Sequence, residues 1–202
     1  MNSKIGIFGG TFDPVHMAHI TIAECFLNQM NLDKCIFVPA FISPFKTDSR
    51  PVSSPLHRLK MLELALADNK LFEIDDYEIS KSDISYTYNT IEYLKDKNPS
   101  SDLFLLIGAD QAKDFTKWYN WEAILNEVQL CIALRPGYNE LNEDFMIIEQ
   151  LSICGKKPLQ LNLPELNVSS SAIRENITLS NDINDLVPFK VLEYIKLNNL
   201  YL

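Results

Sequence analysis

Two histidines that follow a pair of glycines near the start of the chain carry the first chemical signal. An apolar run over residues 4–8 ends in a Gly-Gly pair, and a Thr-Phe-Asp-Pro segment leads into a stretch with helical periodicity. Glycine lets a ligand approach the main chain, and the N–H groups at a helix N-terminus bind anions. His16 and His19 are three residues apart, so both imidazoles are expected on one side of the helix start, where a polyphosphate could lie. The other binding residues expected here are Gly9, Gly10, Thr11 and Phe12.

Thr87 and Trp118, in the middle of the chain, have side chains that suit a small aromatic anion. Thr87 is predicted to cap a helix over residues 87–97, where its hydroxyl and nearby N–H groups would meet an anion. Trp118 offers a flat face for a ring and follows a Gly-Ala-Asp segment after an apolar strand. The acidic stretch 73–78 is expected to be solvated, so no carboxylate is expected beside Thr87 to accept a hydrogen bond from a neutral amide.

The elements that must position these residues alternate between strand and helix patterns with short loops between them. Strands are predicted over residues 5–8, 35–38, 71–79, 103–107, 130–134 and 159–161. Helices are predicted over residues 17–30, 55–67, 87–97, 118–127 and 141–154, then over a short segment capped by Ser169, and finally after residues 185–188. The order is typical of an α/β protein with a doubly wound, largely parallel sheet and helices on both faces. Ligands of such sheets bind beyond the carboxyl ends of the strands, where Lys46, Asp110 and Arg135 also fall.

Length and charge narrow the class of protein. The chain has 202 residues, of which 47% are hydrophobic and 22% charged, which fits a single domain over residues 1–202. Residues 169–202 form a C-terminal helical portion of that domain. The net charge of −9 argues against a broad nucleic-acid surface. No apolar run is long enough to cross a membrane, and the start of the chain does not resemble a signal peptide.

Cysteine and histidine spacing predicts neither a disulfide framework nor a metal site. Two histidines need a further ligand, and the third, His57, lies on another predicted helix. Reduced, mostly buried thiols in a cytoplasmic protein are expected instead. The sequence is compatible with a homo-oligomer but does not define one. The cysteines are Cys25, Cys35, Cys131 and Cys154.

Two segments together resemble a known superfamily. Residues 10–19 are similar to the G-x-F-D-P-x-H-x-G-H signature of the nucleotidyltransferases, with Ala18 in place of the glycine between the histidines. Residues 168–174 are similar to the second signature, I-S-S-T-x-I-R. Across the whole chain the resemblance is to the bacterial nicotinate-nucleotide adenylyltransferases, with Phe45 where that family often has His. The further matching segments are 37–39 with Lys46, 61–65, 85–87, 108–110 with 118–119, 135–138 and 187–201.

The resemblance implies a Rossmann-like fold and a reaction of ATP with nicotinate mononucleotide that gives deamido-NAD and pyrophosphate, with Mg²⁺ as cofactor. It also implies roles. His16, His19 and Arg174 would be catalytic, contacting the phosphates, and Asp13 would shape its turn. For Arg135, an ion pair with a carboxylate is as consistent as a ligand contact. The remaining implied ATP-binding residues are Gly9, Gly10, Thr11, Phe12, Lys46, Gly108, Asp110, Ser170 and Ser171, and the mononucleotide-binding residues are Thr87, Trp118, Tyr119 and Arg135.

Two other functions stay open at this stage. One is an adenylyltransferase of the same superfamily that acts on nicotinamide mononucleotide or phosphopantetheine. The other is a nucleotide-binding regulator without catalysis, which the Ala18 departure motivates. Comparing turnover on a panel of acceptors distinguishes nicotinate mononucleotide from the other acceptors. ATP binding without release of pyrophosphate would identify a regulator.

Overall fold

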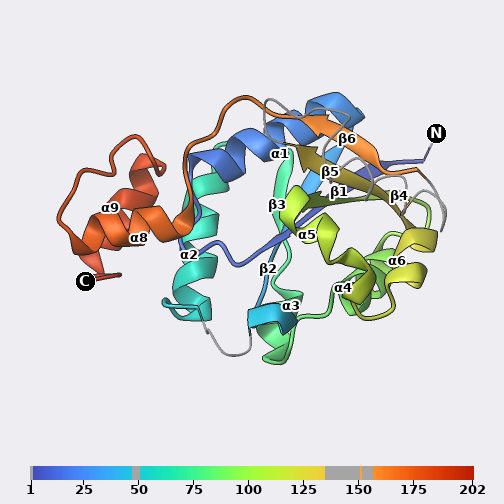
Figure 1. The fold of residues 1–202 in the computed structure, drawn as a ribbon, viewed down its shortest axis with the longest axis horizontal. Helices are drawn as coiled ribbons and strands as arrows, with labels where there is room; N and C mark the ends of the chain where they lie inside the picture. Colours follow the sequence, from blue (N-terminus) through green and yellow to red (C-terminus); the bar gives the residue numbers. More distant parts are fainter. Residues whose placement is uncertain (1, 47–50, 135–150, 152–156) are drawn as a thin grey trace.

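A six-stranded parallel sheet forms the centre of the molecule (Figure 1). The computed structural model describes residues 2–46, 51–134, 151 and 157–202. The strand order is β3-β2-β1-β4-β5-β6, with every described neighbouring pair parallel. This confirms the doubly wound sheet that the sequence predicts. The strands are β1 (Lys4–Gly10), β2 (Lys34–Pro39), β3 (Phe72–Ile74), β4 (Asp102–Gly108), β5 (Val128–Leu134) and β6 (Leu159–Asn162).

The strand order reverses at β1, between β2 and β4, and in a doubly wound sheet such a switch point opens a crevice at the carboxyl ends of the strands. β1 pairs with β2 on one side and with β4 on the other, so the chain leaves β1 toward one edge and later returns to build the other. Gly9 and Gly10 are the last residues of β1 and pair with Val38 and Pro39, so they extend the strand instead of forming the turn after it. Gly6 lies deeper in β1, where a Cβ atom would come within 2.7 Å of Leu32 and Phe26, so glycine lets the following helix pack closely.

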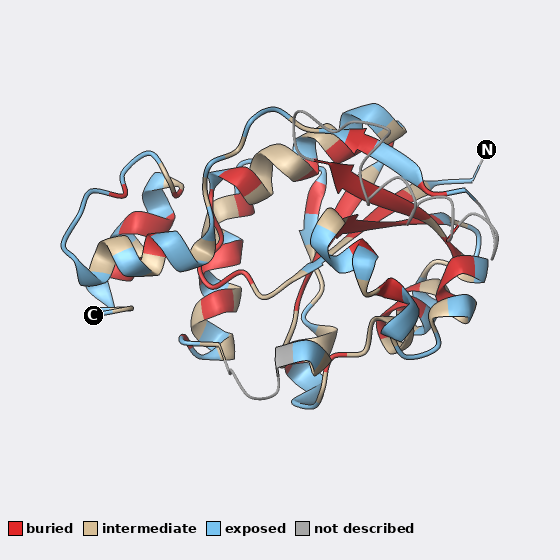
Figure 2. Ribbon diagram, viewed as in Figure 1, coloured by how far each residue is buried: buried red, intermediate tan, exposed pale blue. Residues whose placement is uncertain are grey.

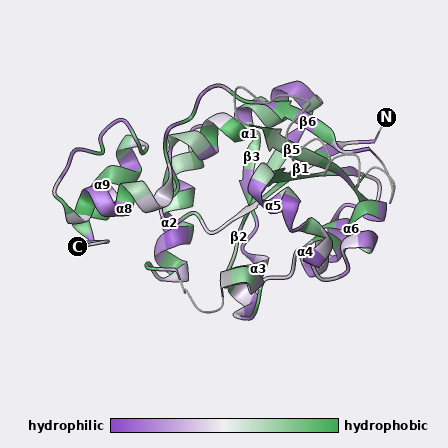
Figure 3. Cartoon of the chain, viewed as in Figure 1, coloured by the Kyte–Doolittle hydropathy of each residue, from purple (hydrophilic) through white to green (hydrophobic). Residues whose placement is uncertain are grey.

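Helices cover both faces of the sheet, and the buried residues gather along the strands (Figure 2). One face packs against α1 and α2, with α9 packed in turn on α2, and the other face packs against α4, α5 and α6. The strands are hydrophobic, whereas the outer sides of the helices are mixed or hydrophilic (Figure 3). Among the described helices, none is long and apolar enough to cross a membrane. The helices are α1 (Met17–Met30), α2 (Pro55–Leu66), α3 (Tyr77–Lys81), α4 (Thr87–Lys97), α5 (Ala109–Lys113), α6 (Trp121–Glu127), α8 (Ser170–Thr178) and α9 (Phe189–Leu197), with short 3₁₀ turns η1 (Pro44–Lys46) and η2 (Phe115–Lys117).

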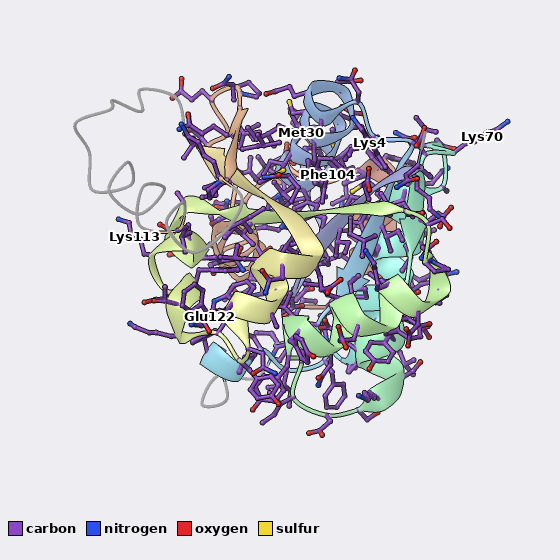
Figure 4. The ribbon with its side chains drawn as sticks, turned by 90° about the vertical axis from the view of Figure 1, so that its right-hand side faces the viewer. Lys4, Met30, Lys70, Phe104, Lys113 and Glu122 are labelled. Atoms are coloured by element: carbon purple, nitrogen blue, oxygen red, sulfur yellow. The ribbon has the colours of Figure 1, made fainter. Side chains whose placement is uncertain are left out.

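The C-terminal helices project from one end of the sheet yet share its core (Figure 1). Ile173 of α8 and Val191 of α9 belong to the same apolar cluster as Phe12 and Val15 from the segment after β1. The apolar core therefore continues from the sheet into the C-terminal helices. At the amino ends of the strands, away from this contact, the Lys4 ammonium lies 5.8 Å from the ring centre of Phe104, and Met30 lies close by (Figure 4).

Three predicted elements differ from the structure. The strand expected over residues 71–79 ends at Ile74, and α3 begins at Tyr77. The helix expected over residues 118–127 starts at Trp121, because Asn120 adopts a left-handed conformation with φ of 52°. The Gly-Ala-Asp segment opens α5, a helix that the sequence analysis missed. All three lie in stretches too short for periodicity to separate strand, helix and loop.

Candidate active site

A cleft of about 370 Å³ opens at the carboxyl ends of β1, β2 and β4. Its walls come from the end of β1, from η1, from the start of α4 and from the segment that joins η2 to α6. The cleft therefore brings together the histidine segment and the Thr87–Trp118 region, which are far apart in the sequence. The predicted site residues that line it are Gly9, Gly10, Thr11, His19, Thr87, Gly108, Trp118 and Tyr119.

The two histidines stack on each other at the start of α1. Their ring centres are 3.7 Å apart and their planes differ by 25°. The main-chain N–H of His16 donates to Nδ1 of His19 at 3.2 Å, so His19 carries its proton on Nε2 when neutral. Nδ1 of His16 is buried and has no hydrogen-bond partner, a state that a ligand or water usually relieves. The rings thus offer hydrogen-bonding atoms beside the cleft.

Burial sets the charge of both histidines. His16 is only 5% exposed, and burial lowers its pKa to about 4. Burial also lowers the pKa of His19 well below its usual range, and the neighbouring His16 lowers it further. Both imidazoles are therefore neutral near pH 7 in the free protein. They can donate hydrogen bonds to phosphate oxygens without a permanent positive charge.

The segment that leads into the histidines is buried throughout. Phe12 has φ of 50° and packs its ring against Phe8 and Phe37, with ring centres 5.5 and 5.6 Å away. Its side chain is 1% exposed and does not line the cleft. The predicted contact of Phe12 with ATP can therefore come only from its main chain.

Asp13 holds this segment in place, as the sequence predicts. Its carboxylate accepts hydrogen bonds from the N–H of Val52 at 2.7 Å, from the N–H and hydroxyl of Ser53, and from the Tyr201 hydroxyl at 2.7 Å. A carboxylate that is only 3% exposed has lost most of its contact with water, and these donors replace that water. These hydrogen bonds tie the turn at Asp13 to Val52, Ser53 and Tyr201.

The second predicted phosphate motif lies against the same segment. Ser169 caps α8 by accepting from the N–H of Ala172, as predicted. The hydroxyl of Ser170 donates to the Pro14 carbonyl at 2.9 Å. Arg174 donates to the Asp13 carbonyl at 2.6 Å and to the Ser171 hydroxyl at 3.2 Å. None of these α8 side chains lines the cleft itself.

The side of the cleft formed by Thr87, Trp118 and Tyr119 is rich in aromatic rings. Thr87 is the first residue of α4 and not its cap, since Tyr86 holds the cap position. At that position its N–H still lacks a helical acceptor and remains suited to an anion. The Trp118 and Phe45 rings lie across from each other with centres 6.4 Å apart, and Tyr119 packs against Tyr86 at 5.2 Å. Phe45 is 54% exposed, so a planar ligand ring has access to this side.

Glu78 is a site residue that the sequence analysis missed, and its expected solvation is wrong. It lines the cleft from α3 and accepts a hydrogen bond from the Thr90 hydroxyl at 2.5 Å. Burial raises the pKa of Glu78, while hydrogen bonds from Thr90 and Ser85 act in the opposite sense. Interpreting residues 71–79 as one strand concealed the helix that turns this carboxyl inward.

Arg58 is a second residue that was missed. It is fully buried in α2 and donates to the Thr11 carbonyl at 2.8 Å and to the Phe41 carbonyl at 3.3 Å. It therefore joins the loops that follow β1 and β2. The sequence does indicate its burial, because Arg58 lies three and four residues before Met61 and Leu62 and so shares the apolar stripe of α2.

Several predicted residues lie apart from the cleft or outside the described residues. Asp110 is exposed in the first turn of α5, where Gln111 instead lines the cleft and accepts from the Gly108 N–H at 3.0 Å. Ala18 is buried and does not narrow the cleft. The Lys46 side chain, Arg135, most of the helix expected over residues 141–154 and Cys154 lie outside the described residues. Within the described ranges, no three His, Cys, Asp or Glu side chains gather as a metal site.

Comparison with known proteins places this arrangement in a family. The cytidylyltransferase-like family model matches residues 7–176. A nicotinate-nucleotide adenylyltransferase of Bacillus subtilis is 36% identical over 198 residues, and a probable one of Clostridium tetani is 38% identical over 201 residues; each match covers 98% of both chains. The fold is similar to that of a Plasmodium falciparum nicotinic acid mononucleotide adenylyltransferase complexed with NaAD, with a TM-score of 0.79, 24% identity and coverage of 99% of this chain and 98% of that one. The stacked histidines, the two-sided cleft and these full-length matches agree: the chain belongs to the nicotinate-nucleotide adenylyltransferases of the cytidylyltransferase-like family.

Proposed function

We propose that the protein transfers AMP from ATP to nicotinate mononucleotide and so forms deamido-NAD and pyrophosphate. One observation carries the proposal. A single cleft has the glycine end of β1 and His19 on one side, and Thr87 and Trp118 on the other. Each side suits one half of a dinucleotide, and the volume of about 370 Å³ is in the range of small-molecule sites.

The reaction needs no nucleophilic side chain. The phosphate of the mononucleotide attacks the α-phosphorus of ATP in line, and pyrophosphate leaves from the opposite side. Gly9 lets the nucleotide lie against β1. His19 and His16 donate hydrogen bonds to the phosphates and stabilise the charge that develops at phosphorus. Lys46 and Arg174, with Ser170 and Ser171, hold the departing pyrophosphate.

The acceptor is held by its ring and its carboxylate. The pyridine ring stacks on Trp118, and the carboxylate accepts hydrogen bonds from Thr87 and from the main chain at Tyr119. Gly108 lines the cleft and contacts the adenosine ribose, and Arg135 contacts a phosphate. Mg²⁺ bound to the ATP phosphates would neutralise part of their charge, and among the described residues no His, Cys, Asp or Glu cluster is built to hold the ion itself.

Glu78 favours a second candidate activity, the use of nicotinamide mononucleotide. Its carboxyl lines the acceptor side of the cleft and could accept a hydrogen bond from an amide. The Thr90 hydroxyl already occupies one of its oxygens, and an ionised Glu78 would repel the nicotinate carboxylate. The raised pKa of Glu78 reduces that repulsion, which supports nicotinate as the main acceptor.

The decisive experiment supplies the purified protein with ATP, Mg²⁺ and each acceptor in turn. Pyrophosphate release and mass spectrometry of the product are measured for nicotinate mononucleotide, nicotinamide mononucleotide and phosphopantetheine. His19→Ala should lower kcat/KM by roughly 10²-fold or more, whereas His57→Ala, outside the cleft, should not. ATP binding without pyrophosphate release on any acceptor would refute the proposal and support a regulator.

We also propose a cytoplasmic location, no nucleic-acid partner, and a chain able to form homo-oligomers. The thiols of Cys25, Cys35 and Cys131 are free, which supports a reducing compartment. The net charge of −9 argues against a broad nucleic-acid surface, but not against a single nucleotide, which needs only a few local cations.

A further inference from the structure

Tyr201, the penultimate residue, reaches the buried segment that carries the histidines. Its hydroxyl donates to the Asp13 carboxylate at 2.7 Å and lies 3.3 Å from the Ser53 hydroxyl. Asp13 precedes His16 by three residues, and every residue from Phe12 to His16 is buried. Because this segment is close-packed, a displacement of Asp13 is expected to displace the imidazole rings of His16 and His19 as well.

Other contacts from the C-terminal portion secure the same segment at its main chain. Arg174 donates to the Asp13 carbonyl, and Ser170 donates to the Pro14 carbonyl. The N–H of Met17, in the first turn of α1, donates to the Leu186 carbonyl at 2.9 Å. Tyr201 differs from these because it is bonded to the Asp13 side chain, and no ligand contact is assigned to it.

The Asp13–Tyr201 contact is built as a fixed bond rather than a loose surface contact. Asp13 is 3% exposed, so each donor to its carboxylate replaces lost water. Burial and the Asp13 carboxylate raise the pKa of Tyr201, which keeps the phenol protonated and able to donate. The Tyr201 main chain is held in turn, since its carbonyl accepts from the Thr178 hydroxyl at 3.3 Å.

We infer that Tyr201 is a positioning residue for the histidine pair, acting through Asp13. The inference rests on the proposed function for its kinetic consequence but not for its structural one. Loss of the Tyr201 hydroxyl leaves Asp13 with fewer donors, and the segment shifts until the carboxylate finds water. The histidines move with it, so transition-state stabilisation falls while binding of the distant acceptor is kept.

The test compares Tyr201→Phe with Tyr194→Phe. Both tyrosines are half-buried in the C-terminal portion, but the Tyr194 hydroxyl bonds Nδ1 of His57 at 2.9 Å, away from the cleft. The chain has three histidines, so protein labelled with ¹³C at one ring carbon of histidine gives one ring signal for each of them, and single substitutions assign the signals. Tyr201→Phe should shift the His16 and His19 signals and spare His57, whereas Tyr194→Phe should shift only His57.

Kinetics adds a second readout. Tyr201→Phe should lower kcat about tenfold with unchanged KM for the mononucleotide, because small displacements of catalytic groups cost rate. Tyr194→Phe should keep wild-type kcat. Ser53→Ala removes another donor to the Asp13 carboxylate, so it should shift the same His16 and His19 signals. This variant tests the inference if Tyr201→Phe does not fold.

The outcomes separate the inference from the proposed function. A folded Tyr201→Phe protein with unshifted His16 and His19 signals, or with the kcat of Tyr194→Phe, overturns the positioning role. If Tyr201→Phe does not fold, unshifted His16 and His19 signals in Ser53→Ala overturn it. If wild-type protein releases no pyrophosphate, the proposed function fails, and the histidine signals alone then decide whether Tyr201 positions the pair.

Discussion

At the scale of single residues, Gly9 and Gly10 differ in what a side chain would meet. A Cβ atom at Gly9 would have no atom within 4 Å, whereas one at Gly10 would lie 2.8 Å from the Phe12 ring. Gly9 therefore has no packing reason to be glycine in the free protein. Its open space faces the cleft, where the proposed nucleotide would lie.

Gly9→Ala should leave the melting temperature near that of the wild type and weaken ATP binding about tenfold or more, since a methyl group would meet the bound nucleotide (about 1.4 kcal/mol). Calorimetric titration with ATP and a thermal melt give both quantities. Gly10→Ala is the contrasting variant and should lower stability through its clash with Phe12. Wild-type ATP affinity in Gly9→Ala would mean that the nucleotide does not approach this part of β1.

At the scale of elements, α2 is tied to the loops after β1 and β2 through one side chain. Arg58→Met leaves two part-buried carbonyl groups, at Thr11 and Phe41, without the donor that Arg58 supplies. The free energy of unfolding should fall by about 3 kcal/mol, since each unpaired buried acceptor costs about 1–3 kcal/mol. Urea denaturation measures the loss.

Two further variants check this explanation of Arg58. Lys60→Met, on the exposed side of the same helix, should change stability by less than about 1 kcal/mol. Arg58→Lys should recover only part of the loss, because an ammonium lacks the fork that reaches both carbonyls. Full recovery by lysine would show that charge alone matters at this position.

The N-terminus of α4 and the aromatic segment before α6 should set acceptor choice. N–H donors at a helix start favour nicotinate, whereas an amide would present its NH₂ group to donors. We expect kcat/KM for nicotinate mononucleotide to exceed that for the amide by at least about tenfold. Thr87→Ala should shrink the ratio, and Trp118→Ala should reduce activity on both acceptors. Equal use of both acceptors by the wild type would contradict the carboxylate site and point to Glu78 as an amide acceptor.

At the scale of the whole molecule, the buried histidines make folding sensitive to acid. In the unfolded chain His16 titrates near 6.5, but in the folded protein its pKa is about 4. Between these values the unfolded state binds more protons, so stability is lost as the pH falls through this window. The His16 contribution reaches about 3 kcal/mol, and His19 acts in the same sense. Glu78 acts oppositely, because its raised pKa lets the folded state bind protons more readily.

Urea unfolding of the wild type and His16→Gln at pH 7, 6, 5 and 4 isolates this term. The difference in unfolding free energy between the two proteins should shrink steadily as the pH falls below 6.5. His57→Gln, half-buried outside the cleft, provides the comparison for a histidine replacement as such. A difference that stays constant from pH 7 to pH 4 would show that His16 is not held neutral by the fold.

Local patterns in the sequence were enough to predict the parallel sheet, most of the helices, and the placement of His16 and His19 together at one helix start. Apolar runs such as residues 103–107 identify buried strands because both faces of a parallel sheet are covered. Ser54 and Ser169 mark helix starts because their side chains accept from N–H groups three residues on, and the structure has both bonds. The stacking of His16 and His19 follows from their spacing along one helix.

Contacts between distant segments required the tertiary structure. Glu78 and Tyr201 look like ordinary surface residues in the sequence, and the spacing of Arg58 places it on an apolar stripe without naming its partners. Each is built into the cleft or its support. Tyr201 and Asp13 are 188 positions apart, and Arg58 and Thr11 are 47 apart. Periodicity encodes which side chains face the core, but a polar partner is chosen only when packing brings two segments together and excludes the water that would otherwise satisfy both groups.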